Sequence, residues 1–155
     1  MPSKKSLKVV LAADHAGFTL KEAVKKHVQS LGYDVIDCGT FKAKPDVDYP
    51  PIMQQAAAAV LEYGCPGIIF GGSGNGEAMV ANKVRGIRCA RCVSEWDAKM
   101  ARAHNDAQMM SLGGRVTKPI LGCKIVDVFL KTKFEAGRHL KRLKQFPDYN
   151  STENC

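Results

Sequence analysis

Short apolar segments alternate with longer amphipathic segments along this chain, and this alternation constrains the fold more than any other feature. Runs of strand length lie at residues 8–13, 34–38, 67–70, 87–93 and 108–112. Segments with helical character lie at residues 17–31, 52–63, 77–83, 94–104, 119–130 and 134–146. Strands that alternate with helices form βαβ units, whose parallel strands are covered by helices on both faces. The pattern therefore predicts an α/β fold, a three-layer α/β/α sandwich with a five-stranded parallel, Rossmann-like sheet.

One domain accounts for the whole length. A chain of 155 residues is long enough to bury one hydrophobic core. No linker or repeat divides it, so we assign a single domain to residues 1–155, with a core at about 8–146 and a loose polar tail at 147–155. No apolar run approaches the roughly 20 residues that span a bilayer, and the first residues are polar. We expect a cytoplasmic protein with no membrane partner.

The charge of the chain is uneven. The formal net charge is +8, and the basic surplus lies entirely after Val80. Such a surplus attracts nucleic acids or anionic small molecules. The basic residues are dispersed, however, and aromatic residues make up only 7% of the chain, so no basic helix stripe or stacking surface is evident. We therefore expect a small anionic ligand and no nucleic acid.

Six cysteines are present, and two of them, Cys89 and Cys92, match the CxxC spacing of metal and redox sites. No second pair completes a zinc site. The pair also lies in a predicted strand, where residues three apart point to opposite faces. We interpret the cysteines as small buried residues.

Ligands of parallel α/β sheets bind beside the carboxyl ends of the strands. The segments that follow predicted strands are therefore the first candidates for a site. They are Asp14 with His15, and the residues 39–49, 71–77 and 113–115.

The glycine-rich segment 71–77 carries the strongest local signal. Four glycines in six residues, placed between a buried strand and a helix, allow backbone N–H groups to converge on an anion. The segment lacks the third glycine of the GxGxxG dinucleotide fingerprint. It is not a P-loop either, because Glu77 stands where a P-loop has lysine. A carboxylate there would repel a triphosphate. The same carboxylate is suited to the role of a proton-accepting base beside a developing oxyanion. A purely structural glycine turn is the alternative.

Other polar residues have both a functional and a structural interpretation. His15 follows a strand end but could be an exposed loop residue. His104 ends a predicted helix, where a histidine also interacts favourably with the helix dipole. Arg138 and Arg142 share a helix face at i, i+4, where they could clamp a phosphate or simply face solvent.

An ordered set of motifs extends the argument. These are Ala13-Asp14-His15-Ala16-Gly17-Phe18, Val47-Asp48-Tyr49-Pro50, Gly72-Ser73-Gly74-Asn75-Gly76-Glu77, Ala81-Asn82-Lys83, Gly86-Ile87-Arg88, His104-Asn105-Asp106, Gly113-Gly114-Arg115 and Gly137-Arg138-His139. Together they closely resemble type B ribose-5-phosphate isomerase, a family that includes allose-6-phosphate isomerase and the galactose-6-phosphate isomerase subunits. The resemblance runs from about residue 8 to residue 146.

The resemblance implies an aldose–ketose isomerase of the pentose phosphate pathway, which interconverts ribose 5-phosphate and ribulose 5-phosphate through an ene-diolate. It implies no metal or cofactor, and a homodimer or a dimer of dimers with its active site at the interface. One branch of the family uses a cysteine base just after the third strand, at the position of Gly71. The other branch uses the glutamate that closes the glycine loop, which is Glu77 here.

The resemblance also implies a role for each matching residue. Glu77 is expected to be the proton acceptor, His104 the acid that opens the furanose ring, and Ser73 a donor to the oxyanion together with the loop amides. The expected substrate-binding residues are Asp14, His15, Gly72, Gly74, Asn75, Gly76 and Asn105, with Arg115, Arg138 and Arg142 on the phosphate side.

Two alternatives stay open at this point. A hexose-6-phosphate isomerase would use the same chemistry in a longer pocket. A non-catalytic phosphate-binding α/β module could use the same glycine loop, although Glu77 argues against a passive anion binder.

Overall fold

A five-stranded, wholly parallel sheet forms the centre of the molecule. The computed structural model describes residues 6–149. The strands are β1 (Leu7–Ala13), β2 (Tyr33–Asp37), β3 (Gly67–Gly71), β4 (Cys89–Arg91) and β5 (Met109–Gly113), in the spatial order β2-β1-β3-β5-β4. The predicted five-stranded α/β sandwich is therefore confirmed.

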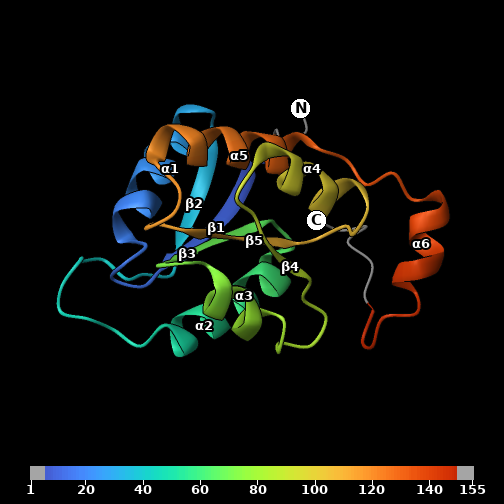
Figure 1. Ribbon diagram of the computed structural model, residues 1–155, viewed down its shortest axis with the longest axis horizontal. Coiled ribbons are helices and arrows are strands. Elements are labelled where there is room, and N and C mark those ends of the chain that lie inside the picture. The colour runs from blue at the N-terminus through green and yellow to red at the C-terminus, as the bar shows by residue number, and fades with distance from the viewer. Residues whose placement is uncertain (1–5, 150–155) are drawn as a thin grey trace.

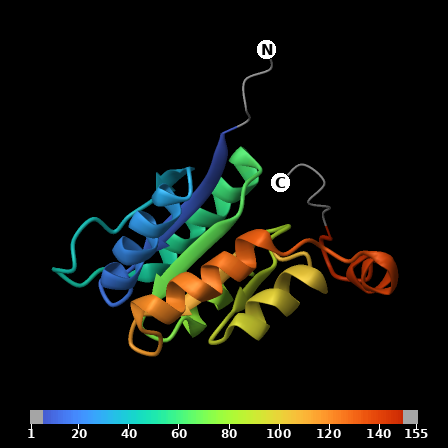
Figure 2. The same cartoon turned by 90° about the horizontal axis from the view of Figure 1, so that it is seen from above.

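Helices cover both faces of this sheet (Figure 1). One face carries α1 (Phe18–Ser30), α4 (Glu95–Ala103) and α5 (Pro119–Lys131), and Figure 2 shows α5 between the other two. The opposite face carries α2 (Tyr49–Tyr63) and α3 (Asn75–Ala81). Each face has its own buried cluster, which the sheet separates. The short helix α6 (Gly137–Leu143) is set apart from the sandwich in both views.

The strand interiors show why these segments form the centre. β3 and β5 are buried along their whole length, as expected for parallel strands covered on both faces. The edge strand β2 is only partly buried. Phe70, Leu112 and Phe129 fill one side of the sheet, whereas Ile69 and Met53 fill the other.

Several predicted boundaries are wrong by a few residues. α2 begins at Tyr49 rather than at residue 52, because prolines are tolerated in the first turn of a helix, where the N–H groups have no intrahelical partner. β4 is shorter than residues 87–93. α6 is shorter than residues 134–146, because Ala136 has a φ of +54°, which lies outside the helical region. Helix α4 begins with a capping box, in which the side chains of Ser94 and Asp97 each accept a hydrogen bond from the other residue's backbone N–H.

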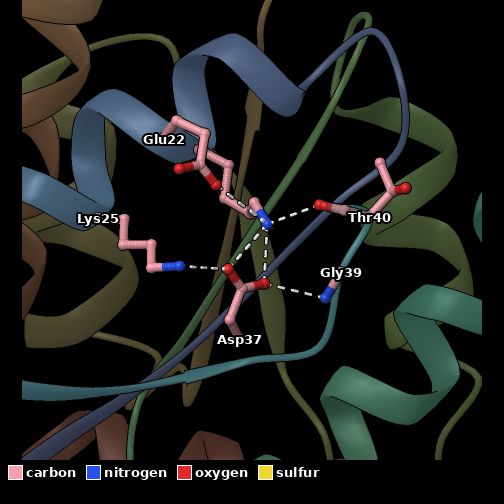
Figure 3. A network of polar contacts seen from close by, with 6 residues as sticks. Glu22, Lys25, Asp37, Gly39 and Thr40 are labelled. Atoms are coloured by element: carbon pink, nitrogen blue, oxygen red, sulfur yellow. Dashed lines mark hydrogen bonds and ion pairs between the residues drawn. The ribbon is translucent and has the colours of Figure 1, made fainter. Parts of the chain in front are cut away.

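A fully buried lysine ties the chain after β2 to the body (Figure 3). Lys21 Nζ lies 2.7 and 2.9 Å from the two carboxylate oxygens of Asp37 and donates a hydrogen bond to the carbonyl of Thr40 at 2.7 Å. Lys25 and the N–H of Gly39 also donate to Asp37. Burial alone would raise the pKa of Asp37, but these donors outweigh it and lower the pKa. The network fixes the start of the long segment that leads to α2.

The CxxC cysteines lie on opposite sides of the sheet, as predicted from their strand spacing. Cys92 belongs to the cluster beneath α4 and α5, whereas Cys89 packs against the cluster beneath α2 and α3. Burial raises the pKa of the Cys92 thiol to about 12 and also raises that of Cys89. The raised pKa values favour the protonated thiols, which are the less nucleophilic form. Cys155 lies outside the described residues.

The first residues of the segment predicted as a loose tail, 147–149, contact the body of the protein. The carboxylate of Asp148 lies 3.1 Å from Arg85, and the ring of Tyr149 lies 5.3 Å from the guanidinium of Arg88. The remaining tail residues, 150–155, lie outside the described part. Among residues 6–149, no helix combines the length and the apolar character that a bilayer span requires.

Candidate active site

Four chain segments meet at the carboxyl ends of β1, β3 and β5. Backbone hydrogen bonds join them directly: Gly114 N–H donates to Gly71 O at 2.7 Å, Arg115 N–H to Gly72 O at 3.0 Å, and Asp14 N–H to Phe70 O at 3.1 Å. The segment after β2 joins through Ala13 N–H, which donates to Gly39 O at 2.6 Å. We call this group of loops the carboxyl-end site.

Glycines make this close approach possible. A methyl group at Gly113 would lie 2.7 Å from the backbone of Ser73, and one at Gly114 would overlap the carbonyl of Ala16. Gly74 adopts a φ of +83°, which favours glycine, and its carbonyl accepts a hydrogen bond from Ser111 Oγ at 2.8 Å. The loop is therefore held rigidly by backbone contacts from its neighbours.

Glu77 lies in the first turn of α3, with only 4% of its surface exposed. Its carboxylate occupies the space directly above Gly71, where any added side chain would overlap it. A reactive side chain at position 71 would therefore fall in the volume that the Glu77 carboxylate fills. Glycine at position 71 makes room for the glutamate.

Two opposing effects act on the Glu77 carboxyl group. Burial raises its pKa, and the nearby carboxylate of Asp14 raises it further, whereas the backbone N–H groups of Glu77 and Gly74 lower it. Burial is the largest effect, and the net pKa lies above the ordinary glutamate value. A raised pKa makes the carboxylate a stronger proton acceptor.

Asp14 lies close enough to Glu77 to raise its pKa, and the next residue, His15, is held differently. Asp14 is buried, and its carboxylate accepts a hydrogen bond from Gly17 N–H at 2.9 Å. The His15 ring is partly exposed, and its Nδ1 accepts a hydrogen bond from Val47 N–H at 3.2 Å. His15 Nε2 also lies 3.6 Å from the carboxylate of Asp46. The segment after β2 therefore fixes the His15 ring against the site.

The outer part of the glycine loop is accessible. Ser73 and Asn75 are exposed, and Ser73 Oγ accepts a hydrogen bond from Asn75 N–H at 3.1 Å. The Tyr49 phenol ring lies against Gly76, so close that a methyl group there would meet its Cζ at 2.7 Å. Arg115 is exposed, and its guanidinium lies over Gly72.

The remaining predicted site residues lie elsewhere. His104 caps the end of α4, and Asn105 follows it, so both precede β5 and lie at the amino ends of the strands. The four residue steps of β5 alone span about 13 Å at about 3.3 Å per residue. Within one chain, His104 therefore cannot reach a substrate that Glu77 contacts.

Arg138 and Arg142 lie on α6, near His104. Both guanidinium groups are exposed, and neither makes a hydrogen bond or ion pair with any residue in the range 6–149. Two unpaired arginines on one short helix provide a site for a dianion. With His104 and Asn105 they make up a second group, which we call the amino-end group.

His104 has two close neighbours, His139 and Glu135. Its ring stacks on the His139 ring, with centroids 4.1 Å apart and planes 14° from parallel. The same Glu135 carboxylate oxygen lies 3.7 Å from His104 Nε2 and 3.6 Å from His139 Nε2. Burial lowers the pKa of His139, and the charges of His104 and the two arginines lower it further.

A cavity of about 550 Å³ also lies at the amino ends of the strands. Its walls include Asn82, Arg85, Arg88 and Asn105, with the 146–149 segment at one side. Glu77 does not line it, so this cavity is not the space in which the predicted base would act.

Sequence reasoning missed two residues that the structure brings to these groups. Tyr49 belongs to a quoted motif, but its first-turn position in α2 depends on a helix start that the prolines concealed. His139 also belongs to a quoted motif, but it was given no role, and its stack on His104 joins residues 35 positions apart in the chain. A sequence pattern alone carries no signal for that contact.

A buried carboxylate beside a rigid glycine loop, at the carboxyl edge of a parallel sheet, defines a class of α/β protein suited to proton transfer on anionic substrates. The chain belongs to the ribose/galactose isomerase family, whose sequence model matches residues 9–146.

Individual relatives agree in length as well as in sequence. The chain is 42% identical to ribose-5-phosphate isomerase B of Mycobacterium tuberculosis over 151 residues, which cover 96% of this chain and 93% of that protein. The solved structure of ribose-5-phosphate isomerase B from Clostridium thermocellum matches with a TM-score of 0.87 and 41% identity, over 90% of this chain and 94% of that one. The Mycoplasma genitalium structure with bound ribulose-5-phosphate matches with a TM-score of 0.86 and 36% identity, over 92% and 95%.

Proposed function

We propose that this protein interconverts ribose 5-phosphate and ribulose 5-phosphate by proton transfer between neighbouring carbons. The single observation that carries the proposal is the buried Glu77 carboxylate, which has a raised pKa and stands above Gly71 beside the glycine loop. The named relatives act on the same pentose phosphate, and one binds ribulose-5-phosphate. This reaction belongs to the pentose phosphate pathway, and such a role suits a cytoplasmic enzyme.

Glu77 acts as the base in this proposal. It removes the proton next to the carbonyl, which leaves an ene-diolate, and returns the proton to the adjacent carbon, while the hydroxyl proton passes from the oxygen that becomes the new carbonyl to the oxygen of the old one. One carboxylate serves both steps when it faces both carbons. The negative charge of the ene-diolate lies against the N–H groups of the glycine loop and the Ser73 hydroxyl. Donors of this kind typically contribute about 2.7–4 kcal/mol each to transition-state stability.

The substrate must also be held at its other end. Asp14, His15, Gly72, Gly74, Asn75 and Gly76 surround the sugar in this proposal. Arg115 approaches the phosphate from the same chain. Ring opening requires an acid, and His104, with Asn105 beside it, has that role.

A second copy of the chain supplies the amino-end group. His104 and the two α6 arginines lie too far from Glu77 within one chain, and α6 is set apart from the sandwich, where it can reach a neighbour (Figure 2). Beside Arg115, the side chains of Val116 and Ile120 are 54% and 78% exposed, which gives a partner an apolar surface to cover. The active unit is therefore a homodimer with two shared sites, or a dimer of such dimers.

Hexose 6-phosphates remain the competing substrates. Mixed-substrate assays with ribose 5-phosphate and allose or galactose 6-phosphate measure the preference directly. No metal or cofactor takes part in the proposed steps, so added chelator should leave turnover unchanged. A non-catalytic phosphate binder would convert none of these sugars.

The Glu77→Gln variant tests the base. It keeps the size and most hydrogen bonds of the side chain but cannot accept the proton, so kcat should fall by at least about 10²-fold. Binding of ribulose 5-phosphate, measured by calorimetry, should change little. Near-normal turnover in this variant would rule out Glu77 as the base.

Subunit mixing tests the shared site. Glu77→Gln and the Arg138→Ala/Arg142→Ala double variant should each be nearly inactive. A mixed dimer contains one site with both intact halves, so activity should return after the two are unfolded and refolded together. Mass spectrometry of the mixture verifies that mixed dimers have formed. If they form and stay inactive, each site is built from one chain.

A further inference from the structure

The cluster of His104, Glu135 and His139 resembles a metal site in its donor set. Two imidazoles and one carboxylate each offer one ligand atom, and the three atoms lie within 4.8 Å of one another. Two histidines with a glutamate are a common protein ligand set for Zn²⁺ with an open fourth position. Imidazole ligands also favour zinc, nickel and copper over magnesium and calcium.

The spacing of the donors is close to that of a tetrahedral site. Metal–ligand bonds of about 2.0–2.2 Å place neighbouring ligand atoms about 3.3–3.5 Å apart around a tetrahedral Zn²⁺. The Glu135 oxygen lies 3.7 Å from His104 Nε2 and 3.6 Å from His139 Nε2. The two imidazole rings are stacked with planes 14° from parallel, so the more exposed His104 ring must turn out of the stack for both lone pairs to meet at one ion.

The backbone already holds the three residues in position. Glu135 N–H donates to Ala103 O at 3.0 Å, which fixes the segment before α6 against the end of α4. His139 is buried, with 7% of its surface exposed, whereas the Glu135 side chain is 55% exposed. One side of the cluster is therefore preorganised, and the other is open to an ion from solvent.

We propose that His104, Glu135 and His139 form a binding site for a zinc-like divalent ion, and that this ion and the cyclic sugar phosphate exclude one another. An imidazole nitrogen bound to the ion cannot deliver a proton to the ring oxygen. The second half of the proposal rests on the role of His104 in the proposed function, whereas the first half does not.

The surrounding charge limits the affinity of the site. Arg138 and Arg142 lie on the same helix as His139 and are both exposed, so they oppose a second cation. Glu135 supplies one negative charge within the cluster. The ion should therefore bind reversibly and be removed by a chelator, unlike a structural zinc in a closed four-ligand site.

Titration of the whole protein with Zn²⁺, followed by calorimetry, tests the binding half. One ion per chain is expected for the wild-type protein, with affinity lowered at least tenfold in Glu135→Gln and in His139→Asn. His27→Asn is the matched control, because His27 pairs with Asp127 at 2.7 Å but has no third ligating residue near it among residues 6–149. Equal affinity in the wild type, Glu135→Gln and His139→Asn would overturn the site. Circular dichroism of each variant verifies that it is folded.

Kinetics test the second half. Zn²⁺ should raise the apparent KM for ribose 5-phosphate in the wild type and in His27→Asn, and a chelator should reverse the effect. Inhibition of Glu135→Gln, measured relative to that variant's own turnover without metal, should require at least tenfold more Zn²⁺ than inhibition of the wild type. Binding at the cluster without inhibition would overturn the mutual exclusion. A protein that binds Zn²⁺ there but isomerises no sugar phosphate would refute the proposed function and leave the metal site standing.

Discussion

Replacing Gly71 by alanine should disable the enzyme through one methyl group. That methyl would lie 2.6 Å from Glu77 Oε2 and closer still to the rest of the carboxylate. Ordinary carbon contacts begin at about 3.5 Å, so the carboxylate must shift by about 1 Å or more. A displacement of about 1 Å from the productive geometry can cost on the order of 10²-fold in rate. We expect kcat to fall by about that factor.

The same substitution should also destabilise the fold. Overpacking a buried position typically costs about 1–3 kcal/mol. For a domain of this size, each kcal/mol lowers Tm by about 2–4 °C. Differential scanning calorimetry and steady-state kinetics with ribose 5-phosphate measure the two effects separately.

A double variant isolates the cause. In Glu77→Ala the space beside position 71 is vacant, so adding Gly71→Ala to that background should cost little. The two substitutions should therefore be non-additive in the free energy of unfolding, by at least about 0.5 kcal/mol. Adding Gly71→Cys instead should recover part of the lost turnover, because a thiolate would then occupy the volume of the carboxylate.

Gly67→Ala provides the control. Gly67 lies at the other end of the same strand, where a methyl group would overlap a side-chain atom of Val60. This variant should lose stability but keep its kcat at a temperature where it is folded. The reasoning is refuted if Gly71→Ala also loses only stability and retains wild-type turnover.

Three further predictions follow from the same geometry. Asp37→Ala leaves the fully buried Lys21 ammonium without its main partner, so the free energy of unfolding in urea should fall by about 3–5 kcal/mol; the exposed Asp148→Ala should cost about 1 kcal/mol or less. Because the pKa of Glu77 is raised, and only its ionised form accepts a proton, kcat/KM should fall on the acid side at a pH above the ordinary value of about 4.3; a profile that stays flat down to about pH 4 would contradict this. Arg138→Ala should raise KM for ribose 5-phosphate roughly ten- to a hundredfold while leaving the poor turnover of unphosphorylated ribose unchanged, which progress curves with both sugars can measure.

Sequence periodicity was enough to predict the layers of this fold, because each strand is a short apolar run and each helix has its own apolar stripe. The order of the strands was not predictable, since parallel pairing depends on contacts between distant segments. The full burial of Lys21 was also concealed. On the sequence it reads as a charge beside the apolar stripe of α1, and only Asp37 and Thr40 explain how it is buried.

The candidate site shows the same limit. Residues that follow strands were correctly predicted to meet, because all parallel strands end at one edge of the sheet. His104 precedes β5, and the same rule places it at the opposite edge, so the sequence did contain a signal for the separation. The pKa of Glu77, in contrast, could not be predicted from the sequence. Burial raises it and a position at the start of a helix lowers it, and only the packing around Gly71 and Asp14 decides which effect is larger.

The distance between Glu77 and His104 also has a genetic consequence. If each site takes one residue from each chain, a chain that has lost only Glu77 still lends a sound His104 to its partner, and a mixed dimer keeps one working site. A chain that has lost both Glu77 and His104 inactivates both sites of the dimer that it forms with a wild-type chain. The single variant should therefore be recessive when both forms are expressed together, whereas the double variant should be dominant and suppress the activity of the normal copy.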